Sequence, residues 1–258
     1  NKTYDGNADA SITSGSVIGV VAGENLKISG IGRFDNKDAA TGKTVTVDDV
    51  SGLVKVNDSG DWKNYNFVST GSMTTVANID KKDVTLASIT AANKTYDGNT
   101  NATVTSGHVI GVVDGESLNI SGTGRFDNKN AGTGKTVTVD DIADLVKDNG
   151  AAGDWGNYRL TSTGAISTTA DIGKKDVTLA SITASNKIYD GNTDATIVSG
   201  TFVGVVTGES LNVSGTGRFD NKNAGTGKTV TVDDVANLVK FNGAGDWENY
   251  KLTSTGTT

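Results

Sequence analysis

Apolar and polar side chains alternate along short stretches of this chain. The clearest stretch, Gly-Lys-Thr-Val-Thr-Val-Asp-Asp, occupies Gly42–Asp49 and returns at Gly134–Asp141 and Gly227–Asp234. β-Branched residues alternating with period two predict a half-buried strand, with its valines facing the core and Lys43 facing solvent. Similar runs, including Ala102–Ser106 and Val109–Val113 as two short strands, predict about seven or eight strands in each repeat.

The period changes directly after this strand. Apolar residues then stand at i, i+3 and i+4, as in Ile142, Leu145 and Val146. This spacing is typical of one or two turns of helix, for which Asp140 or Asp141 is available as the N-cap. We therefore expect a short helical turn after the strand in each repeat.

The fragment Gly-Lys-Thr also occurs in phosphate-binding loops, which makes nucleotide binding one possible function of this stretch. Such a loop needs a glycine five residues before the Gly-Lys pair, where this chain has Lys37, Lys129 and Lys222. The Thr should also open a helix whose N-terminus faces the anion, but a strand pattern follows it. Both differences argue against nucleotide binding at this stretch.

Internal repetition divides the 258-residue chain into three modules. Tyr4, Tyr96 and Tyr189 open equivalent segments about ninety residues apart. We predict modules at residues 1–80, 81–173 and 174–258, the first without its leading strand and the last with its final strand cut short. We therefore expect the chain to be a segment of a longer array.

The order of elements favours an all-β sandwich with one short helical turn per module. A strand, a helical turn and then Asp-x-x-x-Tyr entering a strand is the pattern of the E–F corner in immunoglobulin-like sandwiches, where the Tyr hydroxyl bonds back to upstream backbone. The candidate structural corners are Asp61/Tyr65, Asp154/Tyr158 and Asp246/Tyr250. We predict three tandem immunoglobulin-like modules in an elongated array, with β-grasp-like modules as the alternative.

Composition narrows the possible functions. The net charge of −7 disfavours nucleic acid and anionic membrane surfaces as partners. No apolar run approaches the length of a membrane span, so we expect no membrane insertion. Cysteine is absent, and the single histidine, His108, has no counterpart in the other modules. Because catalysis near neutral pH usually uses a tunable base, we expect no enzymatic activity, no catalytic residue and no required cofactor.

Two repeated sets of side chains are candidates for binding. Adjacent carboxylates could hold Ca²⁺, or one could cap the helical turn while the other is solvated, at Asp48, Asp49, Asp140, Asp141, Asp233 and Asp234. Aromatic faces could stack on sugar rings, or could anchor a corner or interface, at Trp62, Trp155 and Trp247. Arg33, Arg125 and Arg218 could form ion pairs with nearby acidic groups.

The motifs, taken in order, resemble a known family. Tyr-Asp-Gly-Asn at Tyr4, Tyr96 and Tyr189 is followed by Arg-Phe-Asp-Asn-Lys, Gly-Lys-Thr-Val-Thr-Val and Asn-Tyr. This series, which covers essentially the whole chain, resembles the YDG-type repeats of large bacterial surface adhesins of the filamentous haemagglutinin type, secreted by the two-partner route. Two features depart from the family pattern: the helical spacing after Thr-Val-Thr-Val, and Gly-Asp-Trp-x-Asn-Tyr at the corner.

The resemblance implies secretion to the bacterial cell surface and a stalk or spacer role. Each module would contact the neighbouring repeats of the same chain, and the chain would be a monomer. Two alternatives stay open: adhesin modules that bind a host glycan or surface receptor through the Trp-bearing loops, and a spacer stiffened by calcium.

Overall fold

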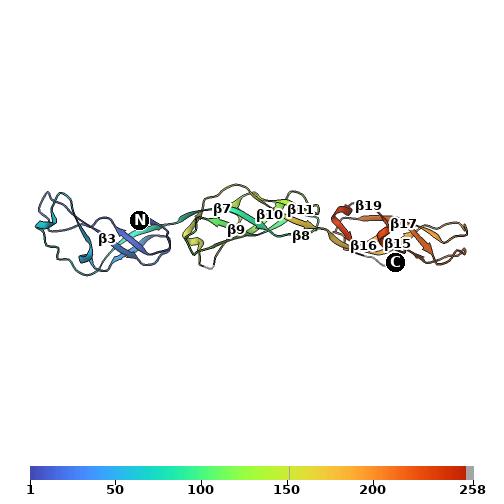
Figure 1. Cartoon of the computed structure of the whole chain (residues 1–258), viewed down its shortest axis with the longest axis horizontal. Helices are drawn as coiled ribbons and strands as arrows, with labels where there is room; N and C mark the ends of the chain where they lie inside the picture. The colour runs from blue at the N-terminus through green and yellow to red at the C-terminus, as the bar shows by residue number, and fades with distance from the viewer. Residues whose placement is uncertain (151, 254–258) are drawn as a thin grey trace. The chain divides into compact units, whose positions relative to one another are not determined.

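The computed structural model describes residues 1–150 and 152–253, and consists of strands joined by short turns. The strands form three sheets in tandem, one for each repeat, which confirms the predicted all-β, sandwich-like class (Figure 1). By its internal packing the chain falls into two compact units. The first comprises Asn1–Ser88, Ser106–Ser121 and Ile142–Gly164, and the second comprises Ile89–Thr105, Gly122–Asp141 and Ala165–Thr258. Module 1 lies within the first unit and module 3 within the second.

Module 1 shows the architecture of a repeat. Its elements are β1 (Lys2–Thr3), β2 (Asp9–Ile12), β3 (Leu26–Phe34), β4 (Ala40–Val47), η1 (Val50–Gly52), β5 (Val54–Asn57), η2 (Trp62–Asn64) and β6 (Met73–Asp80). The sheet order is β1-β6-β4-β3-β2, and β5 also pairs with β3. The first half of β3 pairs with β5 and its second half with β2 and β4, so one strand serves both layers of the sandwich.

Glycine permits this change of partner within β3. Gly30 lies where the pairing with β5 gives way to the pairing with β2. A Cβ at Gly30 would lie 2.5 Å from Leu53 Cδ2, closer than real side chains approach. Only glycine therefore lets Leu53, which follows the η1 turn and is buried, pack directly on the strand.

Module 2 repeats the arrangement. Its elements are β7 (Lys82–Ala91), β8 (Lys94–Thr95), β9 (Asn101–Ile110), β10 (Leu118–Phe126), β11 (Gly132–Val139), η3 (Ile142–Asp144), β12 (Val146–Asn149), η4 (Trp155–Asn157), β13 (Tyr158–Leu160) and β14 (Ile166–Gly173). The prediction of two short strands at Ala102–Ser106 and Val109–Val113 was wrong, because β9 runs without a break from Asn101 to Ile110. Gly107 does not form a turn in this strand. It allows close packing, since a Cβ at Gly107 would lie 2.5 Å from Ile120 Cγ2.

Module 3 contains β15 (Lys175–Ala184), β16 (Asp194–Val203), β17 (Leu211–Phe219), β18 (Val230–Thr231), η5 (Val235–Asn237), β19 (Val239–Asn242), η6 (Trp247–Asn249) and β20 (Tyr250–Leu252). Its sheet order is β18-β17-β16-β15-β20, and β19 also pairs with β17. β20 runs parallel to the start of β15, with Tyr250 opposite Lys175.

In the strand with the repeated Gly-Lys-Thr-Val-Thr-Val sequence, the valines face the core as predicted, but the lysine does not face solvent. Val45 and Val47 are buried in β4, but Lys43 is also only 6% exposed. The prediction for Lys43 was wrong because period-two alternation places residues 43, 45 and 47 on one face. The Lys43 ammonium is satisfied by Asp35 Oδ1 at 2.8 Å and Asn36 Oδ1 at 2.6 Å.

The predicted helical turn is present as a three-residue 3-10 turn in each module: η1, η3 and η5. Val50, Ile142 and Val235 are buried at these turns, as their apolar spacing predicts. Within residues 1–150 and 152–253, no helix is long and apolar enough to cross a membrane.

Candidate functional site

The candidate site lies where module 1 meets the start of module 2, inside the first compact unit. β6 passes into β7 through the single residue Lys81. On the module 1 side, β1 pairs in parallel with the end of β6, and the Tyr4 N–H donates to the Asp80 carbonyl at 2.8 Å. On the module 2 side, β13 pairs in parallel with the start of β7, with Tyr158 opposite Lys82. Backbone pairing thus fixes Tyr4 and Tyr158 on the two sides of Lys81.

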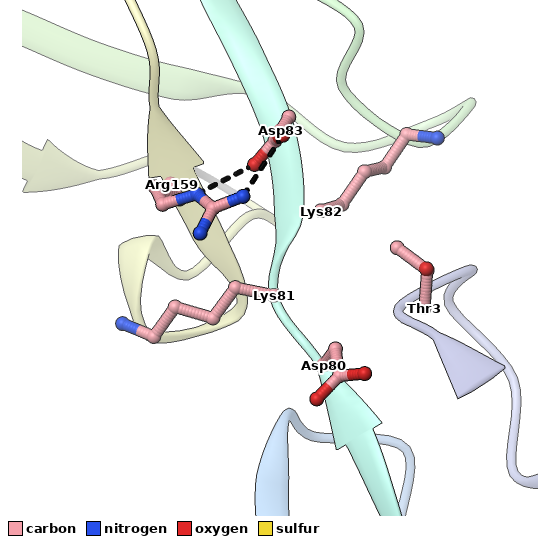
Figure 2. A pocket seen from close by; sticks show the side chains of 6 residues that line it. All are labelled: Thr3, Asp80, Lys81, Lys82, Asp83 and Arg159. Carbon is pink, nitrogen blue, oxygen red and sulfur yellow. Dashed lines mark hydrogen bonds and ion pairs between the residues drawn. The ribbon is translucent and has the colours of Figure 1, made fainter. Parts of the chain in front are cut away.

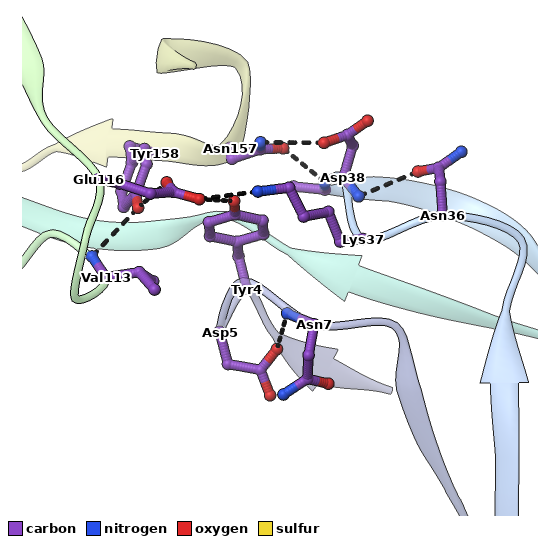
Figure 3. Close-up of polar contacts among 11 residues, drawn as sticks. Tyr4, Asp5, Asn7, Asn36, Lys37, Asp38, Val113, Glu116, Asn157 and Tyr158 are labelled. Atoms are coloured by element: carbon purple, nitrogen blue, oxygen red, sulfur yellow. Dashed lines mark hydrogen bonds and ion pairs between the residues drawn. The ribbon is translucent and has the colours of Figure 1, made fainter. Parts of the chain in front are cut away.

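The Glu116 carboxylate connects these two tyrosines (Figure 3). Its Oε1 accepts hydrogen bonds from the Tyr4 hydroxyl at 2.6 Å and from Lys37 Nζ at 2.9 Å, and its Oε2 accepts one from the Tyr158 hydroxyl at 2.6 Å. The Tyr158 hydroxyl in turn accepts from the Val113 N–H at 3.1 Å. We call Tyr4, Lys37, Glu116 and Tyr158 the first junction. Module 1 contributes two of its residues and module 2 the other two.

The first junction is packed as well as hydrogen-bonded. Tyr4 and Tyr158 are 1% and 2% exposed, and their rings meet edge to face at 5.3 Å between centroids. The Glu116 side chain is 7% exposed, and Lys37, at 45%, covers the carboxylate from the solvent side. The carboxylate is therefore removed from water but has three donors, the condition under which a buried charge is tolerated.

This environment shifts the titration of the junction residues. Burial alone would raise the pKa of Glu116, but the hydrogen bonds from Tyr158, Tyr4 and Lys37 outweigh burial and lower it. Burial and the hydrogen bond to Glu116 both raise the pKa of Tyr158. The hydrogen bond to Glu116 also raises the pKa of Lys37. Near neutral pH the junction therefore holds one carboxylate, one ammonium and two neutral hydroxyls.

The Tyr-Asp-Gly sequence has a separate structural role at each of its positions. Tyr4 reaches Glu116, and the Asp5 carboxylate accepts from Lys2 Nζ at 2.7 Å, which closes the turn on itself. Gly6 has φ +83°, and a Cβ there would lie 2.9 Å from Val113 Cγ1 in module 2. Glycine is thus required both by the backbone conformation and by the close approach of the neighbouring module.

A second contact lies beside the carboxylate. The Asn157 Oδ1 atom accepts from the Ala39 N–H at 2.7 Å, and its Nδ2 donates to Asp38 Oδ1 at 3.2 Å (Figure 3). Asn157 is 3% exposed, whereas Asn64, at the same position in module 1, is exposed. The amide is therefore buried where the preceding module covers it.

The second compact unit contains the same arrangement between modules 2 and 3. Glu209 Oε1 accepts from the Tyr96 hydroxyl at 2.6 Å and from Lys129 Nζ at 2.9 Å, and Oε2 accepts from the Tyr250 hydroxyl at 2.6 Å. Asn249 Oδ1 accepts from the Ala131 N–H at 2.7 Å. We call Tyr96, Lys129, Glu209 and Tyr250 the second junction. Both junctions use equivalent residues at equivalent distances.

A shallow hollow beside the linker is lined by Thr3, Asp80, Lys81, Lys82, Asp83 and Arg159 (Figure 2). Arg159 Nε and Nη2 donate to the two Asp83 carboxylate oxygens at 2.7 and 3.0 Å, so the pair joins β13 to β7. The Lys81 and Lys82 side chains leave the backbone on opposite sides. The hollow therefore contains a strand-joining ion pair flanked by two separate cations.

The corner residues act at the second 3-10 turn of each module. Asp61, Asp154 and Asp246 cap η2, η4 and η6 through bonds to the N–H groups of Lys63, Gly156 and Glu248. The tyrosine that follows each turn bonds back to upstream backbone: Tyr65 accepts from the Val21 N–H at 3.0 Å, Tyr158 from Val113 and Tyr250 from Val206. The corner thus holds the turn that carries Glu24, Glu116 or Glu209 against its tyrosine.

The two adjacent carboxylates of a pair differ in their contacts: the second of a pair can cap a 3-10 turn and the first can pair with an arginine. Asp49 and Asp234 cap η1 and η5, accepting from the N–H groups of Ser51 and Ala236, both at 2.8 Å. Asp140 and Asp233 form ion pairs with Arg125 and Arg218, at 2.7 and 2.9 Å. The predicted arginine ion pairs are confirmed at these two positions.

Asp48 and Asp141 are both exposed. In the described residues no group of three or more His, Asp or Glu side chains is arranged to hold a metal ion.

The tryptophans serve as corner anchors in the structure. Trp155 and Trp247 are 9% and 8% exposed, and their indole N–H groups donate to the Asn119 and Asn212 carbonyls, both at 3.0 Å. Trp62 is half-buried and packs edge to face on Phe67 at 5.6 Å. The corners of modules 2 and 3 are thereby tied to the first half of β10 and of β17.

Sequence reasoning missed the junction residues Tyr4, Lys37, Glu116 and Asn157 and their second-junction counterparts. The available signal was a glutamate that recurs at the same turn position of every module, directly after a glycine, at Glu24, Glu116 and Glu209. Glu116 and Glu209 have no lysine or arginine within three residues in the sequence, which indicates a partner from farther along the chain.

Comparison with known proteins assigns the chain to a family. The family model of the YDG domain matches residues 1–74, 80–165 and 173–258. No curated protein and no solved structure matches the chain. Each matched segment begins with or includes the Tyr-Asp-Gly sequence whose tyrosine, in the first two modules, enters a junction. The chain belongs to the YDG domain family.

Proposed function

We propose that these modules form a structural spacer of an extracellular bacterial adhesin, which projects a binding region from the cell surface. The observation that carries this proposal is the recurrence of one junction, built from Tyr, Lys, Glu and Tyr, at both module boundaries. A spacer has to transmit a fixed orientation from one module to the next, and a recurring junction provides that. The adhesin context and the extracellular location are inferred from the resemblance in the sequence motifs.

The junction resists bending because its contacts lie beside the linker and involve both modules. Lys81 is the only residue between β6 and β7, and each of these strands is paired on its own side of it. Bending at Lys81 would separate Tyr4 from Glu116 and expose both to water. Charge-assisted hydrogen bonds are each worth about 1.5–3 kcal/mol, so opening the junction is costly even though the Lys37 contact is partly screened.

Repeat proteins gain stability from such interfaces one neighbour at a time. Each added module of this kind would bring one more Glu-centred junction, so the array would lengthen without a new type of contact. The partners of each module are accordingly the neighbouring repeats of the same chain, and the chain acts as a monomer. The proposal gives the modules no catalytic role.

Residual dipolar couplings test this proposal directly within the first unit. If the first junction is rigid, amide couplings from module 1 and from residues 142–164 will fit one alignment tensor. The Glu116→Gln variant removes the carboxylate charge and should require two tensors. Glu24→Gln is the matched control, because among the described residues Glu24 accepts from Tyr65 of its own module, at 2.6 Å, and from no tyrosine or lysine of another module. Two tensors in the unaltered chain would overturn the proposal.

The other two functions receive less support from the geometry. A sugar platform needs exposed aromatic faces, and Trp155 and Trp247 are buried. Calcium stiffening needs converging oxygen ligands, and Asp49, Asp140, Asp233 and Asp234 are engaged in caps or ion pairs.

A further inference from the structure

A short loop of module 1 contacts module 2 at two points. This loop, residues 35–39, joins β3 to β4, and we call it the docking loop. Lys37 Nζ donates to the Glu116 carboxylate at 2.9 Å, and the Ala39 N–H donates to Asn157 Oδ1 at 2.7 Å. Both bonds form only if the loop holds the lysine and the Ala39 N–H at fixed places.

The docking loop has little apolar burial to hold it in shape. Ala39 is half-buried, and the other residues of the loop are exposed: Asp35, Asn36, Lys37 and Asp38. Fixing the backbone of such a loop costs conformational entropy. If the loop became ordered only when the modules dock, that cost would offset much of what the junction contacts contribute.

Lys43 holds the docking loop from inside module 1. This buried residue of β4 places its Nζ 2.8 Å from Asp35 Oδ1 and 2.6 Å from Asn36 Oδ1. Asn36 Oδ1 also accepts from the Asp38 N–H at 2.9 Å (Figure 3). One ammonium therefore ties together the first two residues of the loop, and the second of these fixes the backbone of the fourth.

Module 2 holds its own docking loop, residues 127–131 between β10 and β11, in the same way. Lys135 Nζ lies 3.0 Å from Asp127 Oδ1 and 2.7 Å from Asn128 Oδ1. This loop carries Lys129 of the second junction. Both junctions thus have a loop that is tied by a lysine of the following strand.

The network that ties the loop is internal to each module. In module 3, Lys228 Nζ lies 2.7 Å from Asp220 Oδ1 and 2.6 Å from Asn221 Oδ1, so all three modules build it from their own residues at similar distances. A lysine removed from water is tolerated when its ammonium has acceptors, so the loop cannot relax away from the lysine without leaving that charge unpaired. The shape of the loop is therefore set within the module.

We propose that Lys43 and Lys135 are the positioning residues of the first and second junctions. Each preforms the docking loop that the glutamate and asparagine of the next module bind. A preformed loop strengthens docking, because its conformational entropy is lost when the module folds and not when the modules meet. The inference rests on the proposed spacer function, since it states which residues prepare the junction of that spacer.

Methionine at the lysine position tests the inference, because it keeps an apolar stem in the buried site and removes the ammonium. In the full 258-residue chain, Lys43→Met should accelerate amide exchange severalfold at Ala39 and at Tyr4, whose N–H groups lie at the first junction. Exchange should stay unaltered at the Val50 N–H, which donates to the Gly71 carbonyl at 3.1 Å elsewhere in module 1.

Lys135→Met is the matched variant at the other junction. It should accelerate exchange at Ala131 and Tyr96, whose N–H groups donate to Asn249 Oδ1 and to the Gly173 carbonyl. Exchange at Tyr4 should stay unaltered in this variant.

A double variant separates positioning from a general weakening of module 1. If Lys43 acts through the junction, Lys43→Met should accelerate exchange at Tyr4 less in a Glu116→Gln chain than in the unaltered chain, because the junction is already loosened there. If Lys43 only stabilises its own module, the two effects should multiply.

The inference is overturned if Lys43→Met leaves exchange at Tyr4 unaltered, if Val50 accelerates as much as Tyr4, or if the effects of Lys43→Met and Glu116→Gln multiply. With one alignment tensor for the unaltered chain, any of these results removes the positioning role and leaves the spacer function standing. Two tensors for the unaltered chain would overturn the spacer function, and the positioning role with it.

Discussion

The Tyr4 hydroxyl of module 1 donates a 2.6 Å hydrogen bond to the Glu116 carboxylate of module 2, although 112 residues separate them in the chain. Tyr96 and Glu209 form the same bond at the same distance, 113 residues apart. The Tyr-Asp-Gly sequence is therefore a junction element in these modules, and the glutamate is its acceptor.

Neutralising the junction glutamate should loosen the junction more than it loosens the module. In the Glu116→Gln variant, Lys37 loses its counter-ion and the two tyrosine hydroxyls lose a charged acceptor, at a cost of about 1–3 kcal/mol. Hydrogen exchange at the Tyr4 N–H should accelerate accordingly, by about tenfold or more. Glu24→Gln changes the acceptor of the Tyr65 hydroxyl within module 1 and should leave exchange at Tyr4 unchanged. Equal exchange at Tyr4 in the two variants would contradict the role assigned to Glu116.

The contribution of Glu116 should disappear in acid. Its pKa is lowered in the folded chain from the ordinary 4.5, so its stabilising effect is present above that value and is lost as pH falls through the lowered pKa. The difference in local stability between the unaltered chain and Glu116→Gln should therefore be largest near neutral pH and should shrink below pH 4.5. Exchange at the Tyr4 N–H, corrected for intrinsic rates, measures that difference. A gap that stays constant into acid would show that the charge does not contribute.

Three glycines allow the effect of the neighbouring module to be separated from backbone strain. Gly6, Gly98 and Gly191 have φ of +83°, +82° and +84°, so an alanine costs a similar strain of about 1–2 kcal/mol at each. A Cβ would meet Val113 or Val206 at 2.9 Å in the first two cases and nothing within 4 Å at Gly191. Gly6→Ala and Gly98→Ala should therefore lower the melting temperature more than Gly191→Ala does. Equal shifts for all three would count against close packing at the junctions.

Calcium should have no effect on thermal stability if the carboxylates act as caps and ion-pair partners. Asp49 and Asp234 accept backbone N–H groups, and an alanine at either should cost about 0.5–2 kcal/mol. We expect equal melting temperatures in calcium and in chelator, measured by calorimetry. A higher melting temperature in calcium that is lost in Asp49→Ala would support a metal site instead.

The elements that local pattern specifies were predictable from the sequence. Alternating β-branched residues gave the strand with Val45 and Val47, and the i, i+3, i+4 spacing at Ile142 gave the 3-10 turn. The Arg125 and Arg218 ion pairs followed from the proximity of acidic groups in the repeat.

The junction was not predictable in this way, because its information is not local. Nothing near Tyr4 in the sequence indicates Glu116, and the network forms only when the end of module 1 meets the corner of module 2. Lys43 shows a different limit: its charge suggested solvent exposure, whereas its place in the alternation required burial with Asp35 and Asn36 as partners.

Spin-label distances test most directly whether the two junctions are equivalent and rigid. The chain has no cysteine, so labels can be placed at Thr44→Cys with Lys147→Cys in the first unit, and at Thr136→Cys with Lys240→Cys in the second. These four side chains are exposed, and the two pairs occupy equivalent positions across equivalent junctions. We predict one narrow distance distribution for each pair, with the same maximum. Broad distributions, or different maxima for the two pairs, would contradict the proposal that a recurring Glu-centred junction fixes each module on the next.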